Sequence, residues 1–586
     1  MFIRPINVIK KGKRHAYWSL VESYRTERGP RQRVVAYLGK IDEAGRLGIQ
    51  QLADDSVNSN QQDGQQHLFD KSEPQTEPEW IEINAKGVRV ENCRRFGDVW
   101  LGLELIRKLE LDKFFEKIIP AGREEIPWSS IVQILMVSLL CEPSSELYIA
   151  ETFYPKTALS DLLGIPAAKV DDNRLYRALD KILPHKEELE IFLKEKLGSL
   201  FDLEYDLLMY DVTSTYFEGQ CEANPLAQRG YSRDKRGDCK QVCIGLVVSR
   251  CGMPLGYELF AGNTTDVTTV ENIVTTMEKR YGKSDRIWVM DRGMVSDENI
   301  EFLQQGERRY ILGAANSHLK KFEVELLKED WNKIRDGLEV KICKDPQGSE
   351  EVFILCRSRE RFEKDEAIVR RFEQKIEERL ISMTARCEKQ KRDPQKVERE
   401  LGRLLGKNSR AARLFEITVT TTAQGAARIE WSKNEPNRNW ATLSAGCYLL
   451  RSNVTDWSDE ELWRAYIQLT QAEAAFRIHK SDLKIRPIWH QKEERVRSHI
   501  FVCFLAYVLW KTLAAMCQRA DLGDEPRRVL RELKELRVVD VVLPTKSGQE
   551  ITKRCITRPS DHQQILLEHL KLTLPKHLKP TALNPD

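Results

Sequence analysis

Two aspartates stand where short apolar runs end. Asp211 follows LLMY at 207–210, and Asp291 follows RIWVM at 286–290. Short runs rich in branched and aromatic residues are typical of buried β-strands. A carboxylate at the end of a strand is well placed to hold a hard divalent cation, because Mg2+ prefers oxygen ligands. For either aspartate alone, a solvated loop or cap position is the competing interpretation.

A third carboxylate lies on a predicted helix over 459–481. Tyr466, Glu473 and Lys480 are spaced seven residues apart there, which is nearly two helical turns. Arg477 follows Glu473 by four residues, so the spacing places all four side chains on one face of the helix. Glu473 could then ligate a metal ion while Arg477 and Lys480 grip phosphate oxygens. The alternative is an ordinary amphipathic helix in which Glu473 pairs with Arg477.

An ordered series of strands and helices would position these carboxylates. Residues 241–249 and 254–260 indicate a β-hairpin, and 309–313 indicates a further strand. Between the strands, the patterns at 266–281 and 297–305 predict helices. A hairpin followed by alternating helices and strands predicts a mixed α/β sheet.

Helical patterns flank this strand-rich block. Apolar residues recur with helical spacing between 95 and 200, and a long, highly charged helical stretch covers 359–413. The most apolar run, 500–510, has about half of the roughly 20 residues that a membrane helix needs. We therefore expect 498–516 to form a buried core helix and the protein to have no membrane span.

The charge balance hides a strong local asymmetry. The 586 residues carry 93 Lys and Arg against 90 Asp and Glu, a net charge of +3, which by itself argues against a polycationic DNA-coating protein. Residues 1–40, however, hold ten basic and two acidic residues, whereas 41–80 hold two basic and nine acidic ones. The first segment predicts a small basic β-rich module suited to phosphate backbones, or one whose charges are merely solvated. The second, with its run DDSVNSNQQDGQQ, predicts a flexible linker.

Cysteine usage and the first residues bear on the compartment. The 13 cysteines include no C-x2-C pair, which favours reduced thiols over a disulfide framework or a zinc knuckle. The segment MFIRPINVIKKGKRH lacks the apolar core of a secretory signal. We therefore expect a cytoplasmic protein.

Four motifs together resemble a known family. YDVTSTYFEG, FAGNTTD, VMDRGMVSDENI and the spacing Y-x2-L-x3-E-x6-K follow one another between Asp211 and Lys480. In this order they resemble bacterial insertion-sequence transposases of the DDE class, and more narrowly the group with a Y-x2-R-x3-E-x6-K signature. The segment LVESYRTERGPRQRVVAYLG also looks like that group. Tyr466 and Lys480 match the signature, whereas Leu469 stands where it has arginine.

The resemblance implies a fold and a site. It implies an α/β protein with a ribonuclease-H-like mixed-sheet core, which an insertion interrupts before the glutamate helix. It also implies that Asp211, Asp291 and Glu473 are the catalytic, metal-binding triad. We expect Tyr466 and Lys480, which match the signature, and Arg477, from its place on the predicted helix, to contact DNA. The expected regions are a basic β-rich module (1–42), an acidic linker (43–80), a helical DNA-binding region (81–205), the core in two parts (206–318 and 456–520), the insertion (319–455) and a C-terminal region (521–586).

The implied function is DNA transposition. Two Mg2+ ions, with Mn2+ as a substitute, would support cleavage at the element ends and transfer of the freed 3′-hydroxyl into target DNA. The expected partners are the terminal inverted repeats, the target DNA and a second copy of the chain on paired ends, in a bacterial cytoplasm close to the nucleoid. Two alternatives stay open: a ribonuclease-H-like nuclease without strand transfer, and a catalytically silent DNA-binding regulator descended from a transposase.

Overall fold

A computed structural model describes residues 2–10, 13–26, 29–39, 81–120, 122–283, 285–575 and 578. The basic N-terminal segment forms an antiparallel three-stranded sheet in the order β1-β2-β3, from Phe2–Lys10, Lys13–Thr26 and Gly29–Gly39. The β-rich module predicted there is therefore confirmed at the level of the backbone. The linker predicted at 43–80 lies outside the described residues.

A helical region follows, as the apolar periodicity predicts. Its elements are α2 (Gly97–Lys108), α3 (Leu111–Ile118), α4 (Trp128–Cys141), α5 (Glu146–Tyr148), α6 (Leu159–Leu163), α7 (Asp172–Ile182) and α8 (Lys186–Phe201). The most apolar of them, α4, is buried along nearly its whole length, because other helices of the region and α18 surround it.

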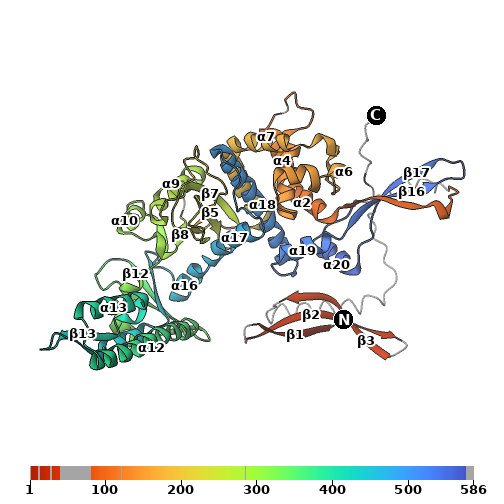
Figure 1. Cartoon of the computed structure of the whole chain (residues 1–586). Coiled ribbons are helices and arrows are strands. Elements are labelled where there is room, and N and C mark those ends of the chain that lie inside the picture. Colours follow the sequence, from red (N-terminus) through yellow and green to blue (C-terminus); the bar gives the residue numbers. More distant parts are fainter. Residues whose placement is uncertain are drawn as a thin grey trace.

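The centre of the molecule is a nine-stranded mixed sheet in the order β10-β11-β12-β15-β9-β8-β5-β6-β7 (Figure 1). The strands of this sheet that come first in the sequence are β5 (Leu207–Tyr216), β6 (Gln241–Ser249), β7 (Pro254–Ala261), β8 (Ile287–Met290) and β9 (Arg309–Gly313). β6 pairs antiparallel with β5 and β7, whereas β8 pairs parallel with β5 and β9. An antiparallel hairpin extended by parallel strands is the predicted ribonuclease-H-like core, and the α/β fold class is confirmed.

Different helices pack on the two faces of this sheet. Leu208 and Tyr210 of β5 pack in one core cluster with α9 (Val270–Tyr281) and α10 (Asp297–Gln305). Leu207 and Met209 pack in the other, with α17 (Thr470–Ser481) and α18 (Glu493–Arg519). Because strand side chains alternate between faces, Asp211 falls on the α17 side together with Met209.

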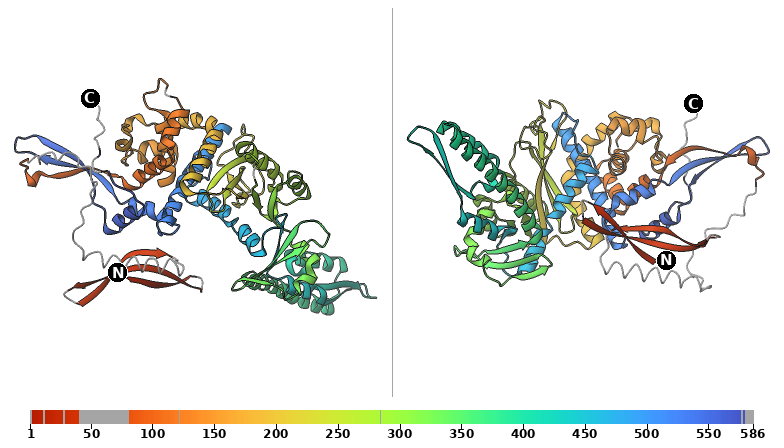
Figure 2. Two further views of the ribbon diagram at one scale, coloured as in Figure 1. Left: turned by 180° about the vertical axis from the view of Figure 1, so that it is seen from behind. Right: turned by 60° about the horizontal axis from the view of Figure 1, so that its bottom comes forward.

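The sheet continues into the range predicted as an insertion. β10 (Asn332–Arg335), β11 (Leu338–Lys344), β12 (Val352–Ser358) and β15 (Cys447–Ser452) extend it by antiparallel pairing. The remaining elements form a separate lobe at one end of the molecule (Figures 1 and 2). They are α12 (Arg359–Lys389), α13 (Pro394–Lys407), α14 (Ser409–Ala412), β13 (Phe415–Thr421), β14 (Ala427–Lys433) and α15 (Glu435–Ser444). This lobe has its own hydrophobic cluster, which includes Ile376 and Leu380.

Helix α18 lies between the core and the helical region and joins them (Figure 1). It is longer than the predicted 498–516, and it packs against α4, α7 and α17. Among the described residues, α18 is the only unbroken helix that is long and apolar enough to cross a bilayer. However, 94% of its most apolar 18-residue stretch is buried inside the protein. As predicted, it is a core helix.

The C-terminal region returns to the start of the helical region. After α19 (Pro526–Leu533), the hairpin of β16 (Arg537–Pro544) and β17 (Glu550–Ile556) pairs through β16 with β4 (Arg89–Arg95). α20 (Asp561–His569) follows. Figures 1 and 2 show this three-stranded sheet projecting at the end of the molecule opposite the insertion lobe.

Candidate active site

The register of two parallel strands places Asp211 beside Asp291. Tyr210 of β5 pairs with Met290 of β8, the last pair in that ladder, so each aspartate is the next residue on its strand. Neighbouring strands lie about 4.8 Å apart, which brings the two carboxylates to the same edge. The prediction that the strand ends before Asp211 is wrong, because β5 continues to Tyr216 by pairing with β6.

Glu473 approaches the two aspartates from α17, a helix that covers this face of the sheet. It lies in the first turn of α17, which packs on β5, and its side chain is exposed. The pKa of Asp211 is raised to about 7, chiefly by burial and also by the charges of Asp291 and Glu473, although a hydrogen bond from the Val212 N–H (2.8 Å) and the charge of Arg233 oppose the shift. The structure therefore places Asp291 and Glu473 near enough to Asp211 for their charges to affect its pKa.

This arrangement suits a divalent cation. Three carboxylates supply only oxygen donors, as Mg2+ prefers. The raised pKa of Asp211 shows that their mutual repulsion and the burial of Asp211 are not fully compensated by the protein's own cations. A bound metal ion would supply the missing positive charge, so the donor set fits it.

Tyr466 contacts one of the three predicted carboxylates directly. It lies near the end of α16 (Asp459–Ile467), and its hydroxyl donates a hydrogen bond of 3.3 Å to Asp291 Oδ1. The approach depends on Gly313 at the end of β9, since a Cβ there would lie 2.6 Å from the Tyr466 hydroxyl and 3.0 Å from the Arg292 backbone nitrogen. Gly313 is not among the residues predicted from sequence, although a glycine that ends an apolar strand is a signal of close approach.

The predicted single helix over 459–481 is wrong, because the structure contains two helices. α16 ends at Ile467 and α17 begins at Thr470, with Leu469 between them. Leu469, at the signature's arginine position, lies at this break, and its side chain is buried in the main hydrophobic core. The break means that helical spacing alone does not align Tyr466 with Glu473.

Lys480 is held by a buried partner. Its Nζ lies 3.0 Å from Asp234 Oδ1, and Arg486 pairs with the same carboxylate. The side chain of Asp234 is 6% exposed and that of Lys480 12%. Burial lowers the pKa of Lys480 and Asp234 opposes that shift. Asp234 was not predicted as a site residue; it comes from the segment between β5 and β6, where the charged run SRDKRGD is the signal that marks it.

Arg477 lies apart from the other predicted residues. It is exposed and lines a different cavity of about 260 Å3, together with Tyr507 and Trp510 of α18. In the described part of the chain no ion pair joins Arg477 to Glu473, so the i,i+4 pair considered for this helix is not formed.

Three family descriptions match the chain. Residues 3–65 match the IS1634 family transposase N-terminal domain, residues 100–194 match a domain of unknown function (DUF4277), and residues 203–509, more than half of the chain, match the transposase DDE domain. No curated protein matches. Among solved structures, the chain is similar to a piggyBac transposase synaptic complex with hairpin DNA, with 10% identity, a TM-score of 0.35, and coverage of 78% of this chain and 82% of that one.

Proposed function

The chain belongs to the DDE transposases and is a DNA transposase, and we propose that Asp211, Asp291 and Glu473 form the metal-binding triad that carries its chemistry. The observation that supports this most is the parallel register, which sets the two aspartates side by side beneath α17. DDE transposase domains use divalent metal ions. Here we propose two Mg2+ ions, which Mn2+ could replace.

The chemistry follows from in-line displacement at phosphorus. When bound, the metal ions supply Lewis-acid stabilisation of the attacking and leaving oxygens. In the first step water attacks a phosphodiester at the element end, and the bond to the 3′-oxygen breaks to free a 3′-hydroxyl. In the second step this hydroxyl attacks a phosphodiester of the target, forming one P–O bond as another breaks. No side chain becomes covalently joined to DNA, so Tyr466 serves to position Asp291.

The rest of the chain would hold the DNA. We propose that the basic module at 1–42 and the helical region at 81–205 bind the terminal inverted repeats, and that 206–318 and 456–520 form the catalytic core. The ten basic residues within 1–40 support backbone contacts by the first of these. Because an element has two ends and both must be cleaved, we propose that the protein acts as a homodimer on paired ends. We also propose that it works at the nucleoid of a bacterial cytoplasm. The region 319–455 is proposed as the insertion and 521–586 as the C-terminal region.

One assay separates this proposal from its two alternatives. The purified protein is incubated with Mg2+, a DNA fragment that carries the native element end, and a supercoiled target plasmid. We expect cleaved ends and end–target joints. Cleavage without joints would indicate a nuclease, and end binding without cleavage would indicate a silent regulator. Inverted repeats that border the reading frame would supply the substrate sequence.

Tyr466→Phe should weaken the metal site without removing it. The change deletes the hydroxyl that donates to Asp291 Oδ1 and leaves the ring in place. Groups that orient metal ligands typically contribute 10–100-fold to metal affinity or activity, so we expect end cleavage to need about 10–100-fold more Mg2+. A Mg2+ titration of the cleavage rate measures this. Tyr448→Phe is the control, because its hydroxyl accepts a hydrogen bond from Trp463, a neutral partner, and it should leave the Mg2+ requirement unchanged.

Lys480→Gln should reduce DNA binding through one phosphate contact. If DNA phosphate displaces the Asp234 carboxylate from Lys480, the loss of the ammonium should lower the slope of log affinity against log salt by about one. Binding of end DNA measured by fluorescence anisotropy from low to high salt gives this slope. An unchanged slope would show that Lys480 remains paired with Asp234 in the complex.

A further inference from the structure

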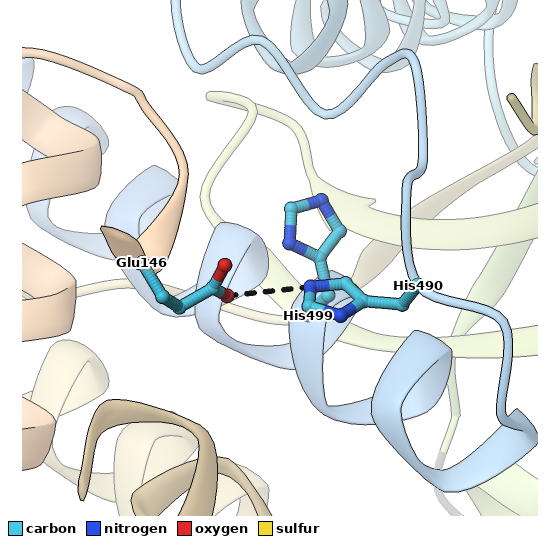
Figure 3. A group of neighbouring side chains, drawn as sticks. All are labelled: Glu146, His490 and His499. Atoms are coloured by element: carbon cyan, nitrogen blue, oxygen red, sulfur yellow. Dashed lines mark ion pairs between the residues drawn. The ribbon is translucent and has the colours of Figure 1, made fainter. Parts of the chain in front are cut away.

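Three metal-ligating side chains meet outside the triad. Glu146, His490 and His499 each offer one ligand atom, and these atoms all lie within 4.8 Å of one another (Figure 3). His490 Nε2 lies 3.3 Å from Glu146 Oε1. Glu146 begins α5 in the helical region, whereas His490, which follows α17, and His499, on α18, lie more than 300 residues further along the chain. The cluster therefore bridges the helical region and the catalytic core.

A metal ion at this cluster would replace a proton. His490 Nε2 lies within ion-pair distance of Glu146 Oε1, and metal ligation needs a bare imidazole nitrogen and an ionised carboxylate in place of that pair.

The separations also agree with zinc coordination. Tetrahedral ligands about 2.0–2.1 Å from Zn2+ lie about 3.4 Å apart. The pair formed by His490 and Glu146 already has that spacing, at 3.3 Å. His499 would close the remaining difference by a small side-chain rotation.

We propose that Glu146, His490 and His499 form a zinc site that fastens the helical region to the catalytic core. Imidazole nitrogen and carboxylate oxygen are typical zinc ligands, whereas the triad offers oxygen alone and suits Mg2+. The two sites would thus select different ions. Three protein ligands leave a fourth position for water, on the side of a cavity of about 280 Å3 that the cluster lines together with Tyr176, Arg486 and Trp489.

Zinc binding to the full-length chain tests the proposal. The protein is titrated with Zn2+ alone as the ligand, in buffer containing excess Mg2+ to fill the triad, and heat of binding and zinc content are measured. We expect one zinc ion per chain at this site, and a higher thermal midpoint with zinc than without it, because zinc binds the folded state. Glu146→Gln and His490→Ala should each lose both the bound zinc and the thermal shift.

Two features keep the result decisive. His562→Ala is the matched control, since His562 pairs with Glu532 at 3.4 Å and, among the described residues, belongs to no group of three possible metal ligands; it should retain zinc binding. Glu146→Gln keeps the size of the side chain and an oxygen that accepts from His490, so a folded variant is available even if a histidine variant unfolds. Failure of the parent to bind zinc, or equal binding by the parent and Glu146→Gln, would overturn the proposal. Either result would leave Mg2+-dependent cleavage untouched.

Discussion

Glu473→Gln and Asp291→Asn should each reduce Mg2+-dependent end cleavage by at least about 1,000-fold. Each change removes one anionic metal ligand and keeps the size of the side chain. Metal ions contribute several kcal/mol of transition-state stabilisation in such reactions, and each 1.36 kcal/mol is tenfold in rate. Both side chains are exposed, so the fold should be unchanged. Initial cleavage rates of a labelled end fragment measure the effect.

A carboxylate outside the proposed metal site supplies the matched control. Glu460→Gln removes an exposed carboxylate of α16 that pairs with Arg464, and it should cleave at the parental rate. Binding of end DNA should persist in Glu473→Gln, because the change affects catalysis and not the phosphate contacts. Parental cleavage by either triad variant would contradict the assignment of that carboxylate.

Phe501→Ala should destabilise the protein by about 3–5 kcal/mol. Phe501 is fully buried in the first half of α18, next to Tyr257 of β7, where α18 packs between the helical region and the core. Removing the ring takes away its burial and leaves a cavity that rigid neighbours cannot fill. Urea denaturation followed by circular dichroism measures the free energy of unfolding.

Tyr231→Ala supplies the contrast for Phe501. The side chain of Tyr231 is 86% exposed, so its removal should change the free energy of unfolding by no more than about 0.5 kcal/mol. A small effect at Phe501 would mean that α18 is not a central element of the folded core.

The sequence was sufficient to predict the core because its signals are local. The apolar runs before Asp211 and Asp291 identify two buried strands, and the spacing of the later helices identifies their cover. The strand register that sets Asp211 beside Asp291 then follows from parallel pairing of runs that end at equivalent positions. The resemblance to the transposases connected these local features with Glu473, which lies 182 residues beyond Asp291.

Features that depend on tertiary packing could not be predicted in this way. The break at Leu469 arises because that side chain is drawn into the core, which a helical periodicity does not reveal. The pairing of Lys480 with Asp234 joins residues separated by 246 positions. β12 and β15 pair in the core sheet although the insertion lobe separates them in sequence. The cluster of Glu146 with His490 and His499 could not be recognised from sequence spacing, because Glu146 lies more than 300 residues before the two histidines.

The most direct test of the triad is to locate the metal ions. Crystals of the transposase with its end DNA, grown in Mn2+, would be measured for anomalous scattering at the manganese edge. We predict two manganese peaks within coordination distance of the carboxylates of Asp211, Asp291 and Glu473. Manganese bound elsewhere, with none at these three carboxylates, would contradict the account.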